Sequence, residues 1–553
     1  MINERSFTPY GVANECRRGL VRGMGYTEEE FKRPIVAVVN SWNEYNPGHV
    51  HLKAVAERVK QGIREAGGLP FECGTTAICD GMVLKDPRYI ELPSRNSVAD
   101  QVELIAESNK FDAMVLLSSC DSIVPGHLMG AARLDIPAIV VTGGYMPMTF
   151  VRGKAANYIE LTDNVGKVMQ GEYPRERAEE EVAAMYGPCG ACGVMTTANS
   201  MCLAAEAMGM TLPGNGGCSA AGSELYQIAY RAGLQIMELL KRGITARKII
   251  TREAVDNAIA LTMAMAGSTN LFMHLPAIAN EAGLREKWWA HFDRASREVP
   301  QIVAASPSGP YHLQEIDAAG GSRAVLRQLL PKLHGEALTV TGQTLAENVQ
   351  DAPIYDPAII RPLTDPVSRE GALYVLYGSL APDGAMIKAA AVEDSMRRFA
   401  GPARCFDSLA AGLAALDAGA IQPGDVCVLR YLGPKGAFGT TSYQFQKELK
   451  GRGLAHDVAI VTDGRFSGGS SGLSIGYLSP EAALGSPLAL VRDGDRIEID
   501  LDQRRIDLMV PEAELAERRK AWDWKFDPTG VPPYLRLFAK NAGSLANGAI
   551  WEF

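Results

Sequence analysis

Residues 116–126 have the sequence Leu-Leu-Ser-Ser-Cys-Asp-Ser-Ile-Val-Pro-Gly, which places Cys120 beside Asp121 at the end of an apolar run. Residues 111–117 are typical of a buried strand, 127–134 of a short helix and 136–141 of a second strand. This order predicts a βαβ unit, in which loops at the carboxyl ends of parallel strands line the ligand crevice. Cys120 and Asp121 are therefore candidate site residues. The alternative is a buried cysteine beside a helix-capping aspartate.

Length and composition favour a globular protein that acts on small molecules. A chain of 553 residues is expected to form two domains. The net charge of −9 gives no sign of the excess of basic residues that is typical of nucleic-acid-binding proteins. No apolar run reaches the roughly 18 residues of a membrane span, and residues 1–25 have no signal-peptide core, so a cytoplasmic location is predicted. Ten cysteines over this length are too sparse for a disulfide scaffold.

The first half of the chain repeats the order of strand, loop and helix. Residues 34–40 are typical of a buried strand, 41–51 of a polar loop and 52–66 of a helix. Residues 75–82 offer a second Cys-Asp pair, Cys79-Asp80. Residues 187–200 form a glycine-rich turn that carries Cys189 and Cys192 and opens an apolar helix. The amino end of a helix lowers thiol pKa values, so this turn could also bind a ligand.

Proline spacing divides the chain near residue 360. Four prolines between 351 and 369 predict a linker between an N-terminal α/β domain with a parallel sheet, residues 1–350, and a C-terminal domain, residues 370–553. Beyond the linker we expect strands at 426–431, 457–462 and 488–491. The alternating segments 496–501 and 505–510 predict a hairpin. The C-terminal domain is therefore predicted to be β-rich and barrel-like.

The ordered motifs of the chain resemble the dihydroxy-acid and phosphogluconate dehydratase family of iron-sulfur hydro-lyases, over nearly its whole length. The motifs are Asn40-Ser41-Trp42-Asn43-Glu44, Leu92-Pro93-Ser94-Arg95, the Cys-Asp-x-x-x-Pro-Gly pattern at 120–126, Cys192-Gly193-x-Met195-x-Thr197-Ala198-Asn199, Gly214-Asn215-Gly216, Leu380-Ala381-Pro382-Asp383-Gly384, Gly433-Pro434-Lys435-Gly436 and Thr462-Asp463-Gly464-Arg465-Phe466-Ser467-Gly468-Gly469.

The resemblance implies an enzyme that removes water from a small 2,3-dihydroxy carboxylic acid to give a 2-oxo acid. It implies a homodimer or a dimer of dimers. The net charge and the lack of a membrane-length apolar run already predict no nucleic-acid or membrane partner. In the family, an iron of the cluster acts on the departing C3 hydroxyl, Mg²⁺ holds the carboxylate and C2 hydroxyl, and a serine takes the C2 proton. The alternatives are a sugar-acid (aldonate) dehydratase and a cluster-containing relative that has lost dehydratase activity.

The resemblance assigns Cys120 and Cys192 as cluster ligands. A third cysteine of the [2Fe-2S] branch is replaced by Gly48, in a Pro-Gly-His-Val-His-Leu sequence that resembles the [4Fe-4S] branch. Either cluster type, [4Fe-4S] or [2Fe-2S], is therefore open. Cys189 and Cys79 are the candidates for the remaining ligand, with Cys189 preferred because the same glycine turn presents Cys192.

The resemblance also assigns Asp80 and Asp121 as Mg²⁺ ligands. Carboxylate oxygens suit this hard cation. Two further ligands of the family are missing. Its carbamylated lysine is replaced by Ser122, and its acidic residue after Gly-Pro-Lys-Gly falls near Ser442. The sequence therefore predicts an altered Mg²⁺ site, or one completed by water and these serines.

Ser467 matches the family's catalytic base. A serine hydroxyl is too weakly acidic to ionise at neutral pH, so this role requires a neighbouring cation. Lys85, Arg88 and Lys435 are candidates for that charge. His49 and His51 are predicted to support the site rather than to react.

Overall fold

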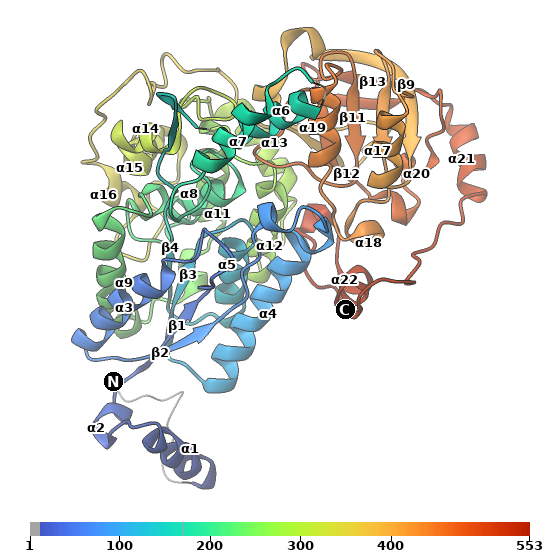
Figure 1. Ribbon diagram of the computed structural model, residues 1–553. Coiled ribbons are helices and arrows are strands. Elements are labelled where there is room, and N and C mark those ends of the chain that lie inside the picture. The colour runs from blue at the N-terminus through green and yellow to red at the C-terminus, as the bar shows by residue number, and fades with distance from the viewer. Residues whose placement is uncertain (1–10, 157, 170) are drawn as a thin grey trace.

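The computed structural model describes residues 11–156, 158–169 and 171–553. It contains two main sheets, one in each half of the chain, and helices lie around both. Figure 1 shows the N-terminal sheet and its helices beside the C-terminal sheet, while α1 (Val12–Gly23) and α2 (Glu28–Phe31) extend away from the body. Both α1 and α2 precede the first strand.

The N-terminal sheet has four parallel strands in the order β2-β1-β3-β4. They are β1 (Ile35–Asn40), β2 (Leu69–Gly74), β3 (Ala113–Ser118) and β4 (Ala138–Thr142). Every residue of β1, β3 and β4 is buried, as expected where helices cover both faces of a parallel sheet. Figure 1 shows α3 (Leu52–Glu65) and α9 (Ser223–Arg242) on one side, and α4 (Leu92–Asn109) and α5 (Ile123–Leu134) on the other.

The C-terminal sheet has eight strands in the order β14-β13-β9-β10-β11-β12-β8-β7. They are β7 (Tyr374–Leu376), β8 (Gly384–Ile387), β9 (Arg398–Phe406), β10 (Val426–Leu429), β11 (Ala459–Thr462), β12 (Ser474–Ser479), β13 (Arg496–Asp500) and β14 (Arg505–Leu508). A bridge between Tyr377 and Arg505 joins the two outer strands. This pairing makes the sheet a nearly closed barrel.

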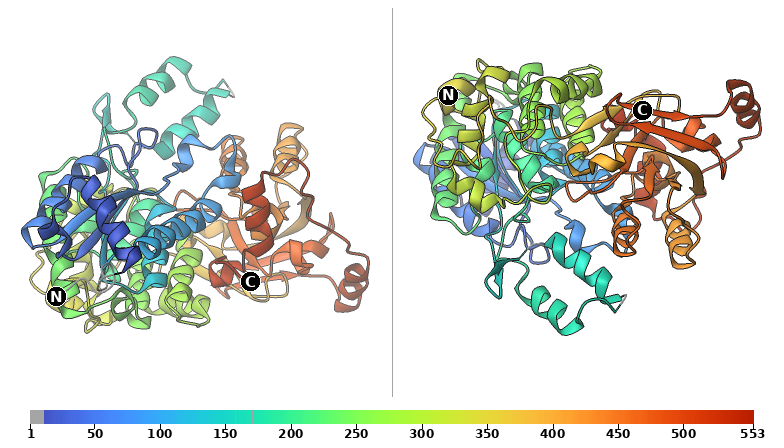
Figure 2. Two further views of the ribbon diagram at one scale, coloured as in Figure 1. Left: turned by 90° about the horizontal axis from the view of Figure 1, so that it is seen from below. Right: turned by 90° about the horizontal axis from the view of Figure 1, so that it is seen from above.

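The remaining helices lie mainly between the two sheets in the sequence. They are α6 (Tyr158–Met169), α7 (Arg175–Ala184), α8 (Thr197–Ala207), α10 (Ala246–Ile249), α11 (Arg252–Ala264), α12 (Leu271–Glu281), α13 (Trp288–Glu298), α14 (Leu313–Ala318), α15 (Gly321–Leu329), α16 (Leu345–Val349), α17 (Leu409–Asp417), α18 (Pro434–Ala437), α19 (Tyr443–Gly451), α20 (Pro487–Leu490), α21 (Glu512–Lys520) and α22 (Pro533–Asn541). A short hairpin joins β5 (Phe150–Val151) to β6 (Lys154–Ala155). Figure 2 shows α6 and α7 extending from the body.

The predicted α/β and barrel-like architecture is confirmed. The expected strands near 34–40, 111–117 and 136–141 form β1, β3 and β4, and the 496–510 hairpin forms β13 and β14. The helix expected at 127–134 begins earlier, at Ile123. The strand expected at 488–491 is wrong: Pro487–Leu490 is the short helix α20. Its short apolar sequence does not distinguish a strand from a buried helical turn, and Pro487 favours the start of a helix.

The C-terminal segment returns to the N-terminal core. Leu535 and Phe538 of α22, and Ile550 beyond it, belong to the same buried cluster as β1 and β3. The predicted domain bounds stay a prediction.

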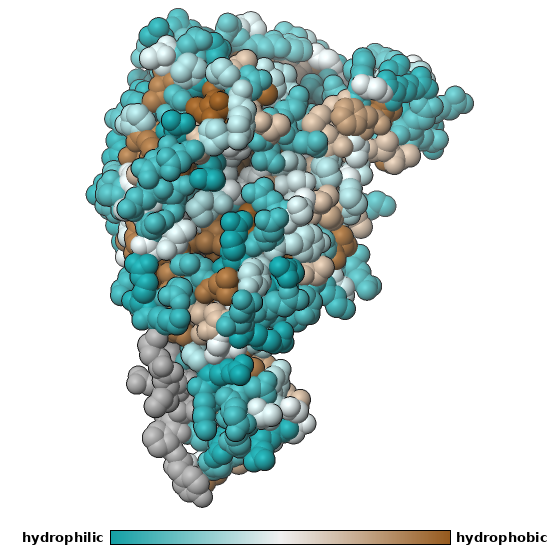
Figure 3. All heavy atoms as spheres, turned by 90° about the vertical axis from the view of Figure 1, so that its left-hand side faces the viewer, coloured by the Kyte–Doolittle hydropathy of each residue, from teal (hydrophilic) through white to brown (hydrophobic). Residues whose placement is uncertain are grey.

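No helix within the described ranges is long and apolar enough to cross a membrane. The face turned to the viewer in Figure 3 is mostly hydrophilic, with apolar residues in scattered patches.

Candidate active site

The predicted site residues of the N-terminal half follow the carboxyl ends of neighbouring strands. Cys79 and Asp80 come after β2, and Cys120 and Asp121 come after β3. Because β1, β2 and β3 are parallel neighbours, these ends meet at one edge of the sheet. The loop that carries Cys192 precedes α8. Two Cys-Asp pairs and a further cysteine are thus available on loops around this edge.

Cys79 and Cys120 lie close together, and the interaction between their thiols lowers the pKa of Cys79 to about 6. The same interaction, together with burial, holds the pKa of Cys120 well above its ordinary value. The Cys120 thiol donates its hydrogen bond to Oδ1 of Asn46 over 3.3 Å. Burial, followed by the charge of Asp121, raises the pKa of Cys192. Cys79 and Cys192 also lie close enough for their charges to interact. Three thiols therefore converge.

Cys189 lies in a different setting. Its pKa is raised by burial alone, and no charge from Cys79, Cys120 or Cys192 contributes to that shift. Its half-buried side chain follows Gly187 and Pro188, three residues before Cys192. The assignment of Cys189 as a ligand stays a prediction, and the geometry favours Cys79 as the third thiol beside Cys120.

His49 supports the backbone of Cys120. The Cys120 N–H donates to Nε2 of His49 over 3.1 Å, so the imidazole proton lies on Nδ1, 2.9 Å from the Ser41 hydroxyl. Ser41 in turn donates to the carbonyl of Leu117. Burial lowers the pKa of His49 to about 3, which keeps the ring neutral. This contact orients a loop and provides no proton for a reaction.

Gly48 lies directly against the Cys120 sulfur. A Cβ atom at position 48 would lie 2.5 Å from Cys120 Sγ and 3.1 Å from Asn46 Oδ1, far inside contact distance. The Cys120 Sγ itself lies 3.3 Å from Asn46 Oδ1. The backbone of residue 48 thus lies beside the Cys120 thiol, and the sulfur of Cys120 fills the space that a side chain at position 48 would need.

Asp80, Asp121 and Glu91 form an acidic cluster. One oxygen from each carboxylate lies within 4.8 Å of the others. Burial and the charge of Glu91 raise the pKa values of Asp80 and Asp121 well above their ordinary range. The N–H of Ala198 in the first turn of α8 donates to Asp121. The cluster therefore joins both predicted metal ligands to an acid that the sequence analysis missed.

Glu91 is completely buried and is held by several partners. His274 Nε2 lies 2.9 Å from Oε2, and Asn270 Nδ2 lies 2.5 Å from Oε1. Arg465 Nη1 lies 3.5 Å from Oε1. Burial would raise the pKa of Glu91, but the charge of Arg465 and the bond from His274 outweigh it and lower that pKa. In the sequence, Glu91 looks like an ordinary acidic residue, because it stands directly before the predicted helix that begins with Leu92-Pro93.

The loop of Ser467 contacts the segment between Cys192 and α8. A Cβ at Gly468 would lie 2.6 Å from both the carbonyl oxygen of Met195 and the Cα of Thr196. The Ser470 hydroxyl donates to the Ser467 carbonyl over 2.6 Å and lies 3.0 Å from the Ser467 nitrogen. Ser467 itself stays partly exposed. The structure thus brings this barrel loop beside the thiol-bearing half.

Lys388 is a second residue that the sequence analysis missed. It directly follows β8, is buried, and its Nζ donates to the carbonyl of Gly468 over 2.9 Å. Burial lowers its pKa to about 7. The signal in the sequence is a single lysine within the apolar run 385–392. Two cations that the sequence did suggest have other partners: Lys435 donates to the carbonyl of Ala542, and Arg88 pairs with Asp86.

Ser122 and Ser442, which replace two expected ligands, are both fully buried. Neither hydroxyl has a hydrogen-bond partner among the described residues. Ser122 lies directly before α5 and Ser442 directly before α19. Neither residue supplies an anionic oxygen.

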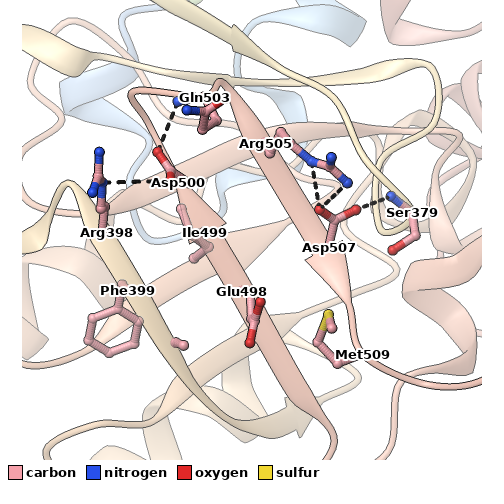
Figure 4. A pocket seen from close by; sticks show the side chains of 11 residues that line it. Ser379, Arg398, Phe399, Glu498, Ile499, Asp500, Gln503, Arg505, Asp507 and Met509 are labelled. Carbon is pink, nitrogen blue, oxygen red and sulfur yellow. Dashed lines mark hydrogen bonds and ion pairs between the residues drawn. The ribbon is translucent and has the colours of Figure 1, made fainter.

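A surface hollow on the barrel lies apart from these residues. Figure 4 shows it over β9, β13 and β14, where Arg505 pairs with Asp507, and Arg398 with Asp500. The Ser379 N–H donates to Asp507 over 2.9 Å. None of the predicted site residues lines this hollow. Two of its arginines pair with two of its aspartates, and it lacks the thiols and the carboxylate cluster of the candidate site.

Comparison with known proteins gives a consistent result over the whole chain. Residues 33–348 match the family model "Dihydroxy-acid/6-phosphogluconate dehydratase N-terminal", and residues 358–549 match the corresponding C-terminal model. The chain is 43% identical to a dihydroxy-acid dehydratase of Oleidesulfovibrio alaskensis, over 98% of this chain and 99% of that protein. It is 44% identical to one of Moorella thermoacetica, over 98% and 99%. It is 45% identical to one of Ignicoccus hospitalis, over 97% of each. The chain belongs to the dihydroxy-acid/6-phosphogluconate dehydratase family, and it is a dehydratase.

Proposed function

We propose that this dehydratase converts a small 2,3-dihydroxy carboxylic acid into a 2-oxo acid, with an iron-sulfur cluster held by Cys79, Cys120 and Cys192. The observation that carries the proposal is the convergence of these three thiols beside Asp80 and Asp121. The relatives described above, which cover nearly the whole chain, are named dihydroxy-acid dehydratases. That name supports the substrate class.

The thiols fit a cluster better than a disulfide or a packing role. All ten cysteines are free, and the contact with Cys120 lowers the pKa of Cys79 to about 6, which favours its thiolate. Thiolates are the usual protein ligands of iron-sulfur clusters, and three of them leave one iron open to substrate in a [4Fe-4S] cluster. When bound, such a cluster supplies a Lewis acid for the leaving hydroxyl.

The protein residues perform the proton transfer and the positioning. The Ser467 oxygen, ionised with the help of a neighbouring positive charge, takes the C2 proton; the C3–oxygen bond breaks, and the captured proton converts the leaving hydroxide into water. The resulting enol becomes the 2-oxo acid when its C2 hydroxyl loses a proton and C3 gains one, so the net change is loss of one water. Asp80 and Asp121 would hold a divalent ion, which would supply positive charge for the substrate carboxylate. We also propose that the protein is a homodimer.

The test is a substrate screen under anaerobic conditions. Purified, reconstituted protein is incubated with short 2,3-dihydroxy acids and with aldonic acids, and 2-oxo acids are measured. We expect turnover of the short dihydroxy acids. Turnover of aldonic acids alone would favour the sugar-acid alternative, and a fully iron-loaded protein without any turnover would contradict the proposal.

A matched pair of serine variants tests the proton transfer. Ser467→Ala should keep its iron and lose turnover, because only the hydroxyl is removed. Ser471→Ala is the control, since Ser471 contributes its backbone carbonyl, and not its hydroxyl, to the bonds with Gln446 and Ser474. Equal activity in the two variants would contradict the role of Ser467.

A further inference from the structure

Glu91 brings a third carboxylate to the two aspartates of the proposed metal site. Its carboxylate, Asp80 and Asp121 each offer an oxygen within 4.8 Å of the others. Metal–oxygen bonds of about 2.0–2.6 Å allow two ligands of one ion to lie up to roughly 4–5 Å apart. One divalent ion can therefore reach all three carboxylates with small side-chain movements.

The charges around this cluster do not balance among the protein groups. Arg465 Nη1 approaches Glu91 at 3.5 Å and adds one positive charge. His274 adds none, because its Nδ1 accepts from Arg95 Nη1 over 3.3 Å and its single proton therefore lies on Nε2, toward Glu91. If all three carboxylates ionised beside this one guanidinium, two negative charges would remain, and a bound divalent cation would neutralise them.

An unpartnered oxygen points to the same ligand. Oδ1 of Asp80 is buried, and no group in the described part of the chain donates a hydrogen bond to it. Buried polar oxygens are nearly always paired, so an orphaned carboxylate oxygen indicates a missing cation or donor. The hydroxyls of Ser122 and Ser442, fully buried at the two positions where the family's anionic ligands are lost, are also unpartnered.

The partners of Glu91 hold its carboxylate in place as those of a metal ligand do. His274 and Asn270 each donate to one of its oxygens, which leaves the remaining lone pairs available. Asn270 is itself fixed by Tyr477, whose hydroxyl lies 2.6 Å from Asn270 Oδ1. The backbone of Glu91 has a positive φ of 64° with ψ of −92°, a combination that is costly for a residue with a side chain. The local backbone is thus strained where the carboxylate turns inward.

We propose that Glu91 is a ligand of a divalent cation together with Asp80 and Asp121, and that it replaces an anionic ligand lost at positions 122 and 442. This inference rests on the proposed function for the place of the ion beside the substrate. The proposed function assigns only Asp80 and Asp121 to the metal. The further inference adds Glu91, which lies outside the sequence motifs shared with the family.

The experiment measures binding of Mn²⁺ by electron paramagnetic resonance, on anaerobic protein with a known iron content. We expect one tightly bound Mn²⁺ per wild-type chain and at least tenfold weaker binding in Glu91→Gln. Asp121→Asn should weaken binding similarly. Glu481→Gln is the matched control, because Glu481 is a buried acid outside the cluster, and it should bind Mn²⁺ as the wild type does.

A second variant of Glu91 and two contradicting outcomes complete the test. Glu91→Asp retains the negative charge on a shorter side chain and should bind Mn²⁺ more tightly than Glu91→Gln. The aspartate variant is the one to measure if the glutamine variant folds poorly. Unchanged Mn²⁺ affinity in a folded Glu91→Gln protein would overturn the inference. So would a wild type that binds no Mn²⁺, as expected if Arg465 alone balances the cluster.

Failure of this inference is distinguishable from failure of the proposed function. A wild type that contains iron and produces 2-oxo acid, but whose Mn²⁺ affinity is insensitive to Glu91, overturns only the role of Glu91. A wild type that binds Mn²⁺ through Glu91, but holds no iron and turns over no dihydroxy acid, overturns only the proposed reaction.

Discussion

The ammonium group of Lys388 lies 2.9 Å from the carbonyl oxygen of Gly468, the residue that follows Ser467. Lys388 is buried, and no carboxylate pairs with it in the described part of the chain. A buried charge without an ionic partner is costly, and burial lowers the pKa of this lysine to about 7. The contact therefore fixes the serine loop at a cost in stability.

Replacement of Lys388 by methionine should lower turnover by about tenfold or more, because a hydrogen bond from a charged donor contributes about 1.5–3 kcal/mol. Iron content should not change, since the thiols lie on other loops. The control is Lys248→Met, which removes a similar bond to the carbonyl of Gly243 on an exposed surface. Wild-type kcat in Lys388→Met would show that the serine loop does not depend on this contact.

Substitution of Gly48 by alanine should displace the Cys120 sulfur, because the added Cβ would lie 2.5 Å from it. We expect a lower iron content and a matching loss of turnover, measured on anaerobically reconstituted protein. Gly81→Ala is the matched control, since its Cβ would lie 3.9 Å from Cys79 Sγ, an ordinary contact. If Gly48→Ala retains full iron, the space beside Cys120 is not restricted as described.

Glu481→Gln should stabilise the protein at alkaline pH. Burial, followed by the charge of Asp463, raises the pKa of Glu481 to about 8. The unfolded chain loses this proton near its ordinary pKa of about 4.5 while the folded protein keeps it, so stability falls as pH rises from 4.5 to 8. Thermal unfolding should show a higher Tm for the variant at pH 9 and little difference at pH 5. Equal Tm values at pH 9 would contradict the raised pKa.

The fold class and part of the site could be predicted because they depend on local patterns. Apolar runs that end in polar loops identify buried parallel strands, and their carboxyl ends meet at one edge, so Cys79, Asp80, Cys120 and Asp121 could be expected there. The alternation of residues 496–510 likewise defines the hairpin of β13 and β14. These features require no knowledge of distant contacts.

Glu91 and Lys388 could not be assigned roles from the sequence because their partners are distant in the chain. Glu91 contacts Asn270, His274 and Arg465, and Lys388 contacts Gly468. The preference for Cys189 rested on its proximity to Cys192 in the sequence and stays untested, whereas the thiol that interacts with Cys120 is that of Cys79. Such pairings depend on tertiary packing rather than on local pattern.

The most direct test of the central claim is the iron and sulfide content of single cysteine variants after anaerobic reconstitution. We expect Cys79→Ser, like Cys120→Ser and Cys192→Ser, to lose most of its iron, whereas Cys189→Ser should keep the wild-type amount. Full iron in Cys79→Ser together with loss of iron in Cys189→Ser would contradict this expectation.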